Sequence, residues 1–292
     1  MTTEPNLIPS GATIEQLATG STWAEGPLWI PDEGVVRWSD IPGDRIMLWD
    51  AATSEISVHR DAVEFTNGRM LDRDGSVVQC SHGRRRLERE MPDGTVTEIV
   101  SHWGEHRLNS PNDVALAPDG SYWFTDPDYG ITQPREGHPG IREYGGCQVF
   151  RWSEAEGLTS VIDDMDRPNG IAFSPDGGTV YVTDTATAAG HGPGHWIRAY
   201  DVHGSEASGG RLFATIDAGV PDGIAVDVEG RVWSSAGDGI HVFSPEGAEL
   251  LFIPAPEVVA NLCFGGPEET DLFITATTSL YRIRTSTRAA QS

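Results

Sequence analysis

The chain has 292 residues and a formal net charge of -24. A protein with this negative net charge repels nucleic acid and anionic membrane surfaces, and we expect neither as a partner. All 20 basic residues are Arg, and the lack of Lys excludes Schiff-base chemistry, a pyridoxal phosphate anchor and a P-loop lysine.

Targeting signals are missing from the sequence. The N-terminal stretch MTTEPNLIPSGATIEQL has no basic flank followed by an apolar run, and no segment approaches the roughly 18 apolar residues of a membrane span. Cys80, Cys147 and Cys263 are far apart and odd in number, which suits free thiols in a reducing compartment. We therefore expect a cytoplasmic protein.

One pattern recurs six times along the chain. Each copy opens on a polar residue, usually before Gly, continues through alternating apolar positions and turns at an acidic residue seven places later. The opening residues are Glu25, Asn67, Asn112, Asn169, Asp222 and Asn261. Their spacing of 39 to 57 residues is typical of propeller units, each too small to bury its own hydrophobic face. We expect one domain over residues 1–292, with short disordered tails at both ends.

The first two units each predict four short strands separated by turn residues. In the first unit the strands span Gly26–Ile30, Val35–Asp40, Arg45–Trp49 and Glu55–His59. In the second unit they span Gly68–Leu71, Ser76–Cys80, Arg85–Arg89 and Thr95–Val100. Four short strands per unit are typical of a propeller blade.

The third unit carries the longest insertion, residues 127–145, before a strand resumes over Cys147–Trp152. The insertion is rich in Gly and Pro, which predicts a surface loop, and a loop of this length in a compact fold is often functional. Tyr129 within it is a candidate substrate contact. Whether the loop forms a lid stays open at this point.

The sixth unit supplies only three strands, near Asn261–Phe264, Asp271–Thr275 and Leu280–Arg284. A spare strand over Thr13–Thr19 precedes the first unit. Its pairing with the last blade would close the ring and leave no open edge there. The sequence therefore predicts an all-β, six-bladed β-propeller of four-stranded blades, closed by the N-terminal strand.

The six opening residues predict a ring at the propeller axis, because the innermost strands of all blades line the central channel. Carboxylate and amide oxygens suit a hard divalent cation, Ca²⁺ first, with Mg²⁺, Mn²⁺ or Zn²⁺ as alternatives. Asn-Gly and Asp-Gly are also common turn signals. Glu25 is a poor turn former at the same repeat position, which favours the metal site.

The motifs AEGPLW, NSPNDVALAPDGSYWFTDPDYG, RPNGIAFSPDGGTVYVTDT and PDGIAVD together resemble the SMP-30/gluconolactonase/luciferin-regenerating enzyme (LRE)-like family, closest to its bacterial gluconolactonase branch. The resemblance covers the chain from Glu25 to about Ile283. It implies a six-bladed propeller that hydrolyses sugar lactones with one divalent metal. The implied metal ligands are Glu25, Asn112, Asn169 and Asp222. Asn67 and Asn261 then remain as lining residues and candidate substrate contacts.

The resemblance also implies that Asp222 is the catalytic base. A carboxylate on a cation is a weak base, since the cation favours its ionised form. His82, Asp126 and Asp184 are therefore alternative proton carriers or substrate contacts, although a structural role fits each of them as well. The run Arg84–Arg86 is interpreted as a solvated strand edge, with attraction of acidic sugars as the alternative.

One metal motif is excluded. Residues 102–106 match the HxxEH pattern of inverted zincins, which requires a helix to bring both imidazoles to one face. Gly104 lies inside this stretch and strands flank it, so we expect no zinc site there.

Three functions stay open on the sequence. The leading hypothesis is a metal-dependent lactonase that converts a small-molecule lactone, derived from a sugar, to the aldonic acid. The first alternative is an organophosphate or phosphotriester hydrolase with the same metal centre. The second is a non-catalytic metal-binding propeller. The sequence is compatible with a monomer or a homodimer.

Overall fold

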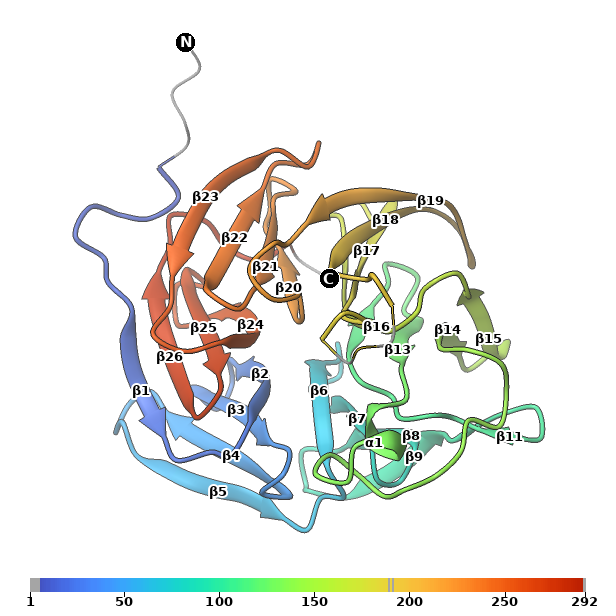
Figure 1. Ribbon diagram of the computed structural model, residues 1–292. Helices are drawn as coiled ribbons and strands as arrows, with labels where there is room; N and C mark the ends of the chain where they lie inside the picture. Colours follow the sequence, from blue (N-terminus) through green and yellow to red (C-terminus); the bar gives the residue numbers. More distant parts are fainter. Residues whose placement is uncertain (1–5, 189, 191, 291–292) are drawn as a thin grey trace.

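The computed structural model describes residues 6–188, 190 and 192–290. Six four-stranded sheets stand around a central axis, and the strand that opens each repeat lies innermost (Figure 1). This confirms the predicted six-bladed β-propeller. Most of the predicted tails, residues 1–5 and 291–292, lie outside the described residues. Where the ends are described they pack together, since Leu7 is buried and its carbonyl accepts a hydrogen bond from the Ser286 amide at 2.8 Å.

The first three blades are antiparallel sheets whose strands follow one another outward in chain order. Blade 1 contains β2 (Ala24–Ile30), β3 (Val35–Asp40), β4 (Arg45–Asp50) and β5 (Ile56–Asp61). Blade 2 contains β6 (Thr66–Leu71), β7 (Val77–Ser81), β8 (Arg86–Glu90) and β9 (Val96–Val100). Blade 3 contains β12 (Val114–Leu116), β13 (Tyr122–Asp126), β14 (Gln148–Ser153) and β15 (Gly157–Ile162).

Blades 4 and 5 repeat this order, and blade 6 is completed from the other end of the chain. Blade 4 contains β16 (Pro168–Phe173), β17 (Thr179–Asp184), β18 (Trp196–His203) and β19 (Glu206–Thr215). Blade 5 contains β20 (Ile224–Val226), β21 (Val232–Ser235), β22 (Gly239–Phe243) and β23 (Glu249–Pro254). Blade 6 contains β24 (Val259–Gly265), β25 (Asp271–Ala276), β26 (Ser279–Arg284) and β1 (Glu15–Thr19).

Ring closure depends on β1, the strand that the sequence left unpaired. It runs antiparallel to β26, with Gln16 opposite Tyr281 and Thr19 opposite Ser279. The first and last parts of the chain thus share one sheet, which confirms the predicted closure. Closure protects the edge of blade 6, because β26 no longer presents free backbone groups to solvent.

The hydrophobic core lies between neighbouring sheets rather than inside any one of them. The second strand of a blade has both faces covered by the adjacent blades, and it therefore carries large buried side chains. Trp38, Trp123 and Trp233 occupy this place on β3, β13 and β21, and each is at most 2% exposed. The repeat is stable only as a ring, because each blade completes the core of the next.

The innermost strands approach each other so closely that a side chain would not fit between them. A Cβ atom on Gly26 would lie 2.5 Å from the Asn67 carbonyl oxygen, and one on Gly170 would lie 2.3 Å from that of Asp222. The glycine after the polar residue is therefore required by the approach of two backbones. The alternative that these polar residues form turns is wrong for Glu25, Asn67 and Asn169, which lie within strands.

A buried carboxylate at the end of the second strand fastens the loop that enters the same blade. Asp126 accepts hydrogen bonds from the Asn109 and Ser110 amides at 2.7 and 2.8 Å. Asp184 accepts bonds from the amides of residues 166 and 167 at 3.0 and 3.3 Å. Asp40 does the same for residues 22 and 23. These contacts satisfy backbone donors that would otherwise be buried without a partner.

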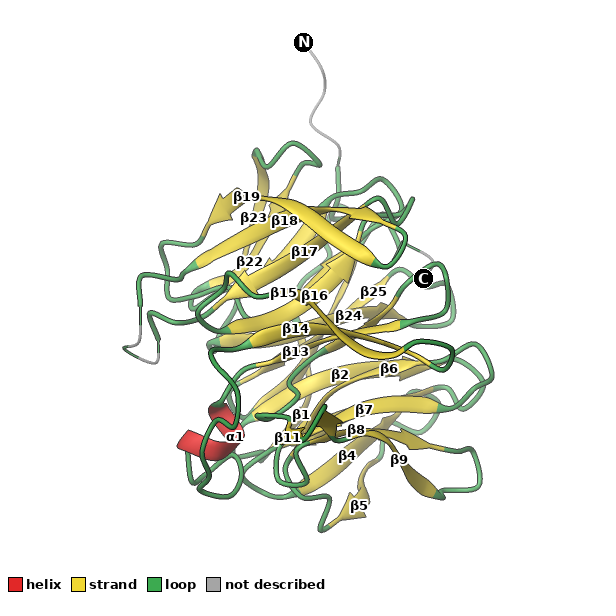
Figure 2. Ribbon diagram, turned by 90° about the vertical axis from the view of Figure 1, so that its right-hand side faces the viewer, coloured by secondary structure: helices red, strands yellow, loops and turns green. Residues whose placement is uncertain are grey.

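The insertion after β13 differs in part from the predicted surface loop. It begins with a single helical turn, α1 (Tyr129–Thr132), and Tyr129, Gly130 and Ile131 are buried. Figure 2 shows α1 on one face of the propeller, beside the ends of the strands. Within the described residues, no helix is long and apolar enough to cross a membrane.

Replacing Asp126 by Ala should lower the free energy of unfolding by about 2 to 4 kcal/mol, because two buried backbone amides lose their charged acceptor. Urea denaturation of the wild type, D126A and D163A measures this, since Asp163 is an exposed carboxylate of the same blade. A loss below about 1 kcal/mol for D126A would contradict the structural role and favour the substrate contact considered from sequence.

Candidate active site

A cavity of about 480 Å³ opens at one end of the central channel. Its floor carries five of the six opening residues of the repeat: Glu25, Asn67, Asn112, Asn169 and Asp222. They come together because each stands at or just before the start of an innermost strand, and these starts meet at the same face of the ring. The predicted convergence is thus observed for five positions.

Asn261 is the exception. Its side chain lines a separate cavity at the other end of the channel, where its amide donates to the Asp113 carboxylate at 3.5 Å. Asn261 begins the repeat in blade 6, where Leu262 replaces the usual Gly, and the side-chain oxygen bonds the Leu262 amide at 2.8 Å. Asn261 is therefore not among the residues that line the first cavity.

Two carboxylates at the floor share a strongly negative environment. Glu25 is 4% exposed, and burial raises its pKa to about 8, with the Asp113 and Glu136 carboxylates acting in the same direction. Burial and the charge of Glu25 likewise raise the pKa of Asp222. Without a cation, the repulsion between the two carboxylates is relieved only when they take up protons.

The donor set at the floor fits a hard divalent cation. The ligands implied for it are the carboxylates of Glu25 and Asp222 and the side-chain amides of Asn112 and Asn169, all of which offer oxygen. Within the described part of the chain, no cluster of three or more His, Cys, Asp or Glu side chains is arranged for a metal. Such a cluster does not include Asn, which supplies two of the four ligands proposed here, so the observation does not argue against this set.

Tyr129, a candidate substrate contact from the sequence, lines the cavity from the insertion. Its hydroxyl is hydrogen-bonded to the Thr185 hydroxyl from the loop after β17. The Arg167 guanidinium lies 5.3 Å from the centre of the Tyr129 ring. The loops of blades 3 and 4 therefore meet above the floor.

His82 lies behind the cavity wall and is fully buried. Its Nε2 lies 3.3 Å from the Asn67 side-chain nitrogen, and its Nδ1 lies 3.1 Å from the Glu136 carbonyl oxygen. Burial lowers the pKa of His82 to about 4, which keeps the ring neutral. Because a carbonyl oxygen only accepts hydrogen bonds, the proton of the neutral ring lies on Nδ1. Through its two nitrogens His82 connects the axis residue Asn67 to the insertion.

Asp126 and Asp184 are both buried within their own blades and do not line the cavity. Besides its backbone contacts, Asp126 accepts a hydrogen bond from Tyr144. Asp184 also accepts one from the Ala186 amide at 3.0 Å. All of these partners are protein groups, so the site is formed without either carboxylate.

Several residues that line the cavity are not predicted by the repeat, because they lie outside it. Gln133 and Glu136 come from the insertion of blade 3, and Thr187 comes from the loop after β17. Apolar side chains cover another part of the wall: Trp23, Ile41, Val220, Val258 and Val259. The position of the insertions in the sequence could have indicated these residues. Both long insertions follow the second strand of a blade, and second strands end beside the starts of the first strands.

The HxxEH stretch does not form the helix that an inverted zincin requires. Residues 102–103 and 106–107 form the short antiparallel hairpin β10–β11 (His102–Trp103 and His106–Arg107), with Trp103 opposite His106. A hairpin places the two imidazoles on different strands instead of on one helix face. The expectation that this stretch is not helical is confirmed.

Known proteins share both this fold and much of its sequence. A gluconolactonase of Zymomonas mobilis is 32% identical, with the alignment covering 96% of this chain and 83% of that protein. A gluconolactonase structure from Xanthomonas campestris is 36% identical with a TM-score of 0.90, covering 96% of this chain and 91% of that one. A calcium-binding regucalcin structure from Agrobacterium tumefaciens, 19% identical, shares the fold with a TM-score of 0.77 over 96% of this chain and 98% of that one.

The family assignment follows from the sequence pattern of the SMP-30/Gluconolactonase/LRE-like region, which matches residues 23–278. This range begins just before β2 and ends after β25, so it includes all five polar residues at the cavity floor. The gluconolactonase relatives extend over nearly the whole chain. This protein belongs to the SMP-30/gluconolactonase/LRE-like family.

Proposed function

We propose that this protein is a metal-dependent hydrolase that opens a sugar lactone to the aldonic acid. The observation that carries the proposal is the cavity floor, where the buried Glu25 carboxylate, the half-buried Asp222 carboxylate and three amides converge beneath a space of about 480 Å³. Such a space accommodates one small ring. Relatives named gluconolactonases support the choice of a sugar lactone as the substrate.

We assign the metal to Glu25, Asn112, Asn169 and Asp222, with Ca²⁺ as the first choice. A related fold is described as a calcium-binding regucalcin, which supports this choice. When bound, a divalent cation would polarise the lactone carbonyl and lower the pKa of a nearby water. It would also balance the negative charge that raises the pKa values of Glu25 and Asp222.

The protein's own groups then perform the proton transfer and the positioning. Asp222 faces the cavity and would accept a proton from the attacking water. The new bond forms between water oxygen and carbonyl carbon, the ring C–O bond breaks, and the ring oxygen takes up a proton. The side-chain nitrogen of Asn67 donates a hydrogen bond to His82, which leaves the Asn67 side-chain oxygen free to accept one from a substrate hydroxyl.

The function is tested by measuring acid release in a pH-stat from D-glucono-1,5-lactone, related aldonolactones and a phosphotriester, with Ca²⁺ and after chelation. We expect Ca²⁺-dependent hydrolysis of at least one aldonolactone at rates above the spontaneous reaction. Cleavage of the phosphotriester alone would favour the organophosphatase. Retention of metal without hydrolysis of any substrate would favour the non-catalytic propeller.

The variant N169A should weaken Ca²⁺ binding by at least about tenfold, because it removes one oxygen ligand from the floor. Isothermal titration calorimetry measures the affinity, and lactone hydrolysis should fall in parallel at limiting Ca²⁺. The matched control is D176N, in the exposed turn of the same repeat. Equal Ca²⁺ affinities for N169A and D176N would remove Asn169 from the ligand set.

Metal affinity should rise with pH. In the metal-free protein the pKa of Glu25 is about 8, so near neutral pH a cation must displace a proton from the carboxyl pair. Below that pKa the affinity should rise by up to about tenfold per pH unit for each proton displaced, and then level off. Calorimetry in buffers of different ionisation enthalpy counts the released protons. A Ca²⁺ affinity independent of pH, with no proton release, would be inconsistent with metal binding at Glu25 and Asp222.

A further inference from the structure

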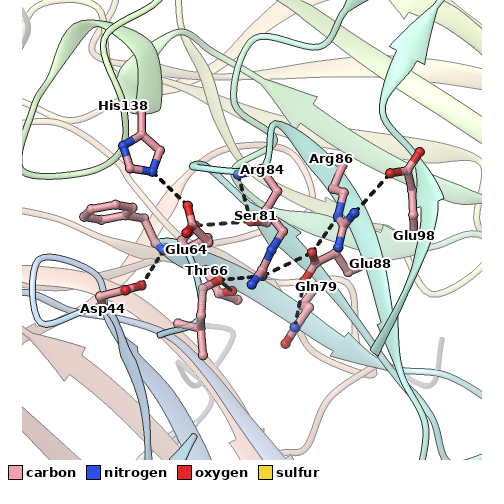
Figure 3. A network of polar contacts seen from close by, with 12 residues as sticks. Asp44, Glu64, Thr66, Gln79, Ser81, Arg84, Arg86, Glu88, Glu98 and His138 are labelled. Atoms are coloured by element: carbon pink, nitrogen blue, oxygen red, sulfur yellow. Dashed lines mark hydrogen bonds and ion pairs between the residues drawn. The ribbon is translucent and has the colours of Figure 1, made fainter. Parts of the chain in front are cut away.

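The insertion of blade 3 is fastened to blade 2 at several points. Figure 3 shows His138 directed at Glu64, and the His138 Nε2 lies 2.8 Å from that carboxylate. The His138 ring also packs edge-on against Phe65, with 5.3 Å between ring centres. Further along, the Arg85 guanidinium donates to the Ile141 carbonyl at 3.3 Å. The insertion is thus held as a fixed wall by contacts with residues near β7 and β8 of blade 2.

The part of the insertion nearest the axis is packed even more tightly. A Cβ atom on Gly130 would lie 2.7 Å from the His82 Cβ, and one on Gly137 would lie 2.1 Å from the Gly130 carbonyl oxygen. Between these two glycines the chain reverses its direction. The Glu136 carbonyl accepts the bond from His82 at 3.1 Å. The backbone at Glu136 is therefore fixed on both sides.

The Glu136 side chain faces the cavity, where it is half-buried. No Arg, His or other donor in the described part of the chain is paired with its carboxylate by a hydrogen bond or an ion pair. Its charge is nevertheless felt at the floor, since it helps raise the pKa of both Glu25 and Asp222. A carboxylate held in a cavity without a protein partner is available to a ligand.

The charges around the cavity all have one sign. Among the described residues that line it, Glu25, Glu136 and Asp222 are acidic and none is basic. The run Arg84–Arg86, considered from sequence as a solvated edge or as a contact for acidic sugars, is occupied elsewhere. Arg84 and Arg86 pair with Glu88, and Arg85 lies 3.5 Å from the Glu143 carboxylate. An anionic substituent on a substrate would find no basic side chain among these described lining residues.

The cavity wall also has two chemically different parts. Glu136, Gln133 and Tyr129 form a polar part that comes from the insertion. Trp23, Val220 and Val258 belong to the apolar part and come from other blades. A sugar ring has hydroxyl groups at its edge and C–H groups on its faces. It can therefore satisfy both parts at once, whereas an unsubstituted lactone ring leaves the carboxylate without a donor.

We propose that Glu136 is a specificity-determining residue that accepts hydrogen bonds from the hydroxyls of a neutral, polyhydroxylated lactone and rejects lactones bearing an anionic group. The inference rests on the proposed lactonase function and narrows its substrate class. Glu136 lies outside the metal-ligand set, and His82 is its positioning residue. The physical basis is that a charged acceptor strengthens hydrogen bonds from hydroxyls and repels a second anion.

The test compares kcat/KM of the wild type and E136Q on three lactones. They are D-glucono-1,5-lactone, δ-valerolactone without hydroxyls, and 6-phospho-D-glucono-1,5-lactone. We expect the preference for gluconolactone over valerolactone to fall about tenfold in E136Q, mainly through KM. The preference for the phosphorylated over the neutral sugar lactone should rise by a similar factor. The control E105Q removes the same charge from an exposed residue outside the cavity and should keep the wild-type ratios.

A binding measurement separates this inference from the proposed function. Calorimetry with 1,5-anhydro-D-glucitol, a sugar ring with no reacting carbonyl, should show about tenfold weaker binding to E136Q than to the wild type or E105Q. Equal binding to all three proteins, or equal substrate ratios in E136Q and the wild type, would overturn the role of Glu136 even if lactones are hydrolysed. A wild type that hydrolyses no lactone but binds the polyol through Glu136 would overturn the lactonase and retain the contact.

Discussion

The close approach of innermost strands at the propeller axis is the constraint on which the rest of the structure depends. Neighbouring backbones bond directly, as from the Gly68 amide to the Asn112 carbonyl at 2.8 Å and from the Gly223 amide to the Ala260 carbonyl at 2.8 Å. Glycine after the polar residue makes this distance possible in four of the six blades. The same approach brings the preceding side chains into one small space, so that a repeated structural position becomes a site.

Concentrating oxygen ligands in this way is electrostatically unfavourable in the absence of a cation. Burial raises the pKa of Glu25 to about 8, and its carboxylate raises that of Asp222 in turn. The surrounding fold offsets this electrostatic repulsion with stabilising contacts that do not involve the residues of the cavity floor. Buried Asp126 and Asp184 fasten entering loops through backbone amides, and β1 closes the ring. The carboxylates that fasten the loops are thus different from those at the cavity floor.

Blades 3 and 4 carry most of what distinguishes this cavity from a plain propeller channel. Tyr129 and Thr185 meet across it from two insertions, while Glu136 projects from a backbone held by His82. The floor is formed by repeat positions, and the insertion adds a wall that carries the Glu136 carboxyl group. Substrate choice can therefore change through the insertion without disturbing the ligands below.

Sequence alone determined the six blades, the closing strand and the residues that converge at the floor, because a strict repeat forces equivalent positions to meet around an axis. It also indicated the insertion of blade 3. Only the tertiary structure decided that Asn261 bonds the Asp113 carboxylate, that Asp126 and Asp184 bond backbone amides, and that Glu136 enters the site. These outcomes depend on the direction of individual side chains and on the path of a non-repeating loop, and contacts between residues distant in the chain set both.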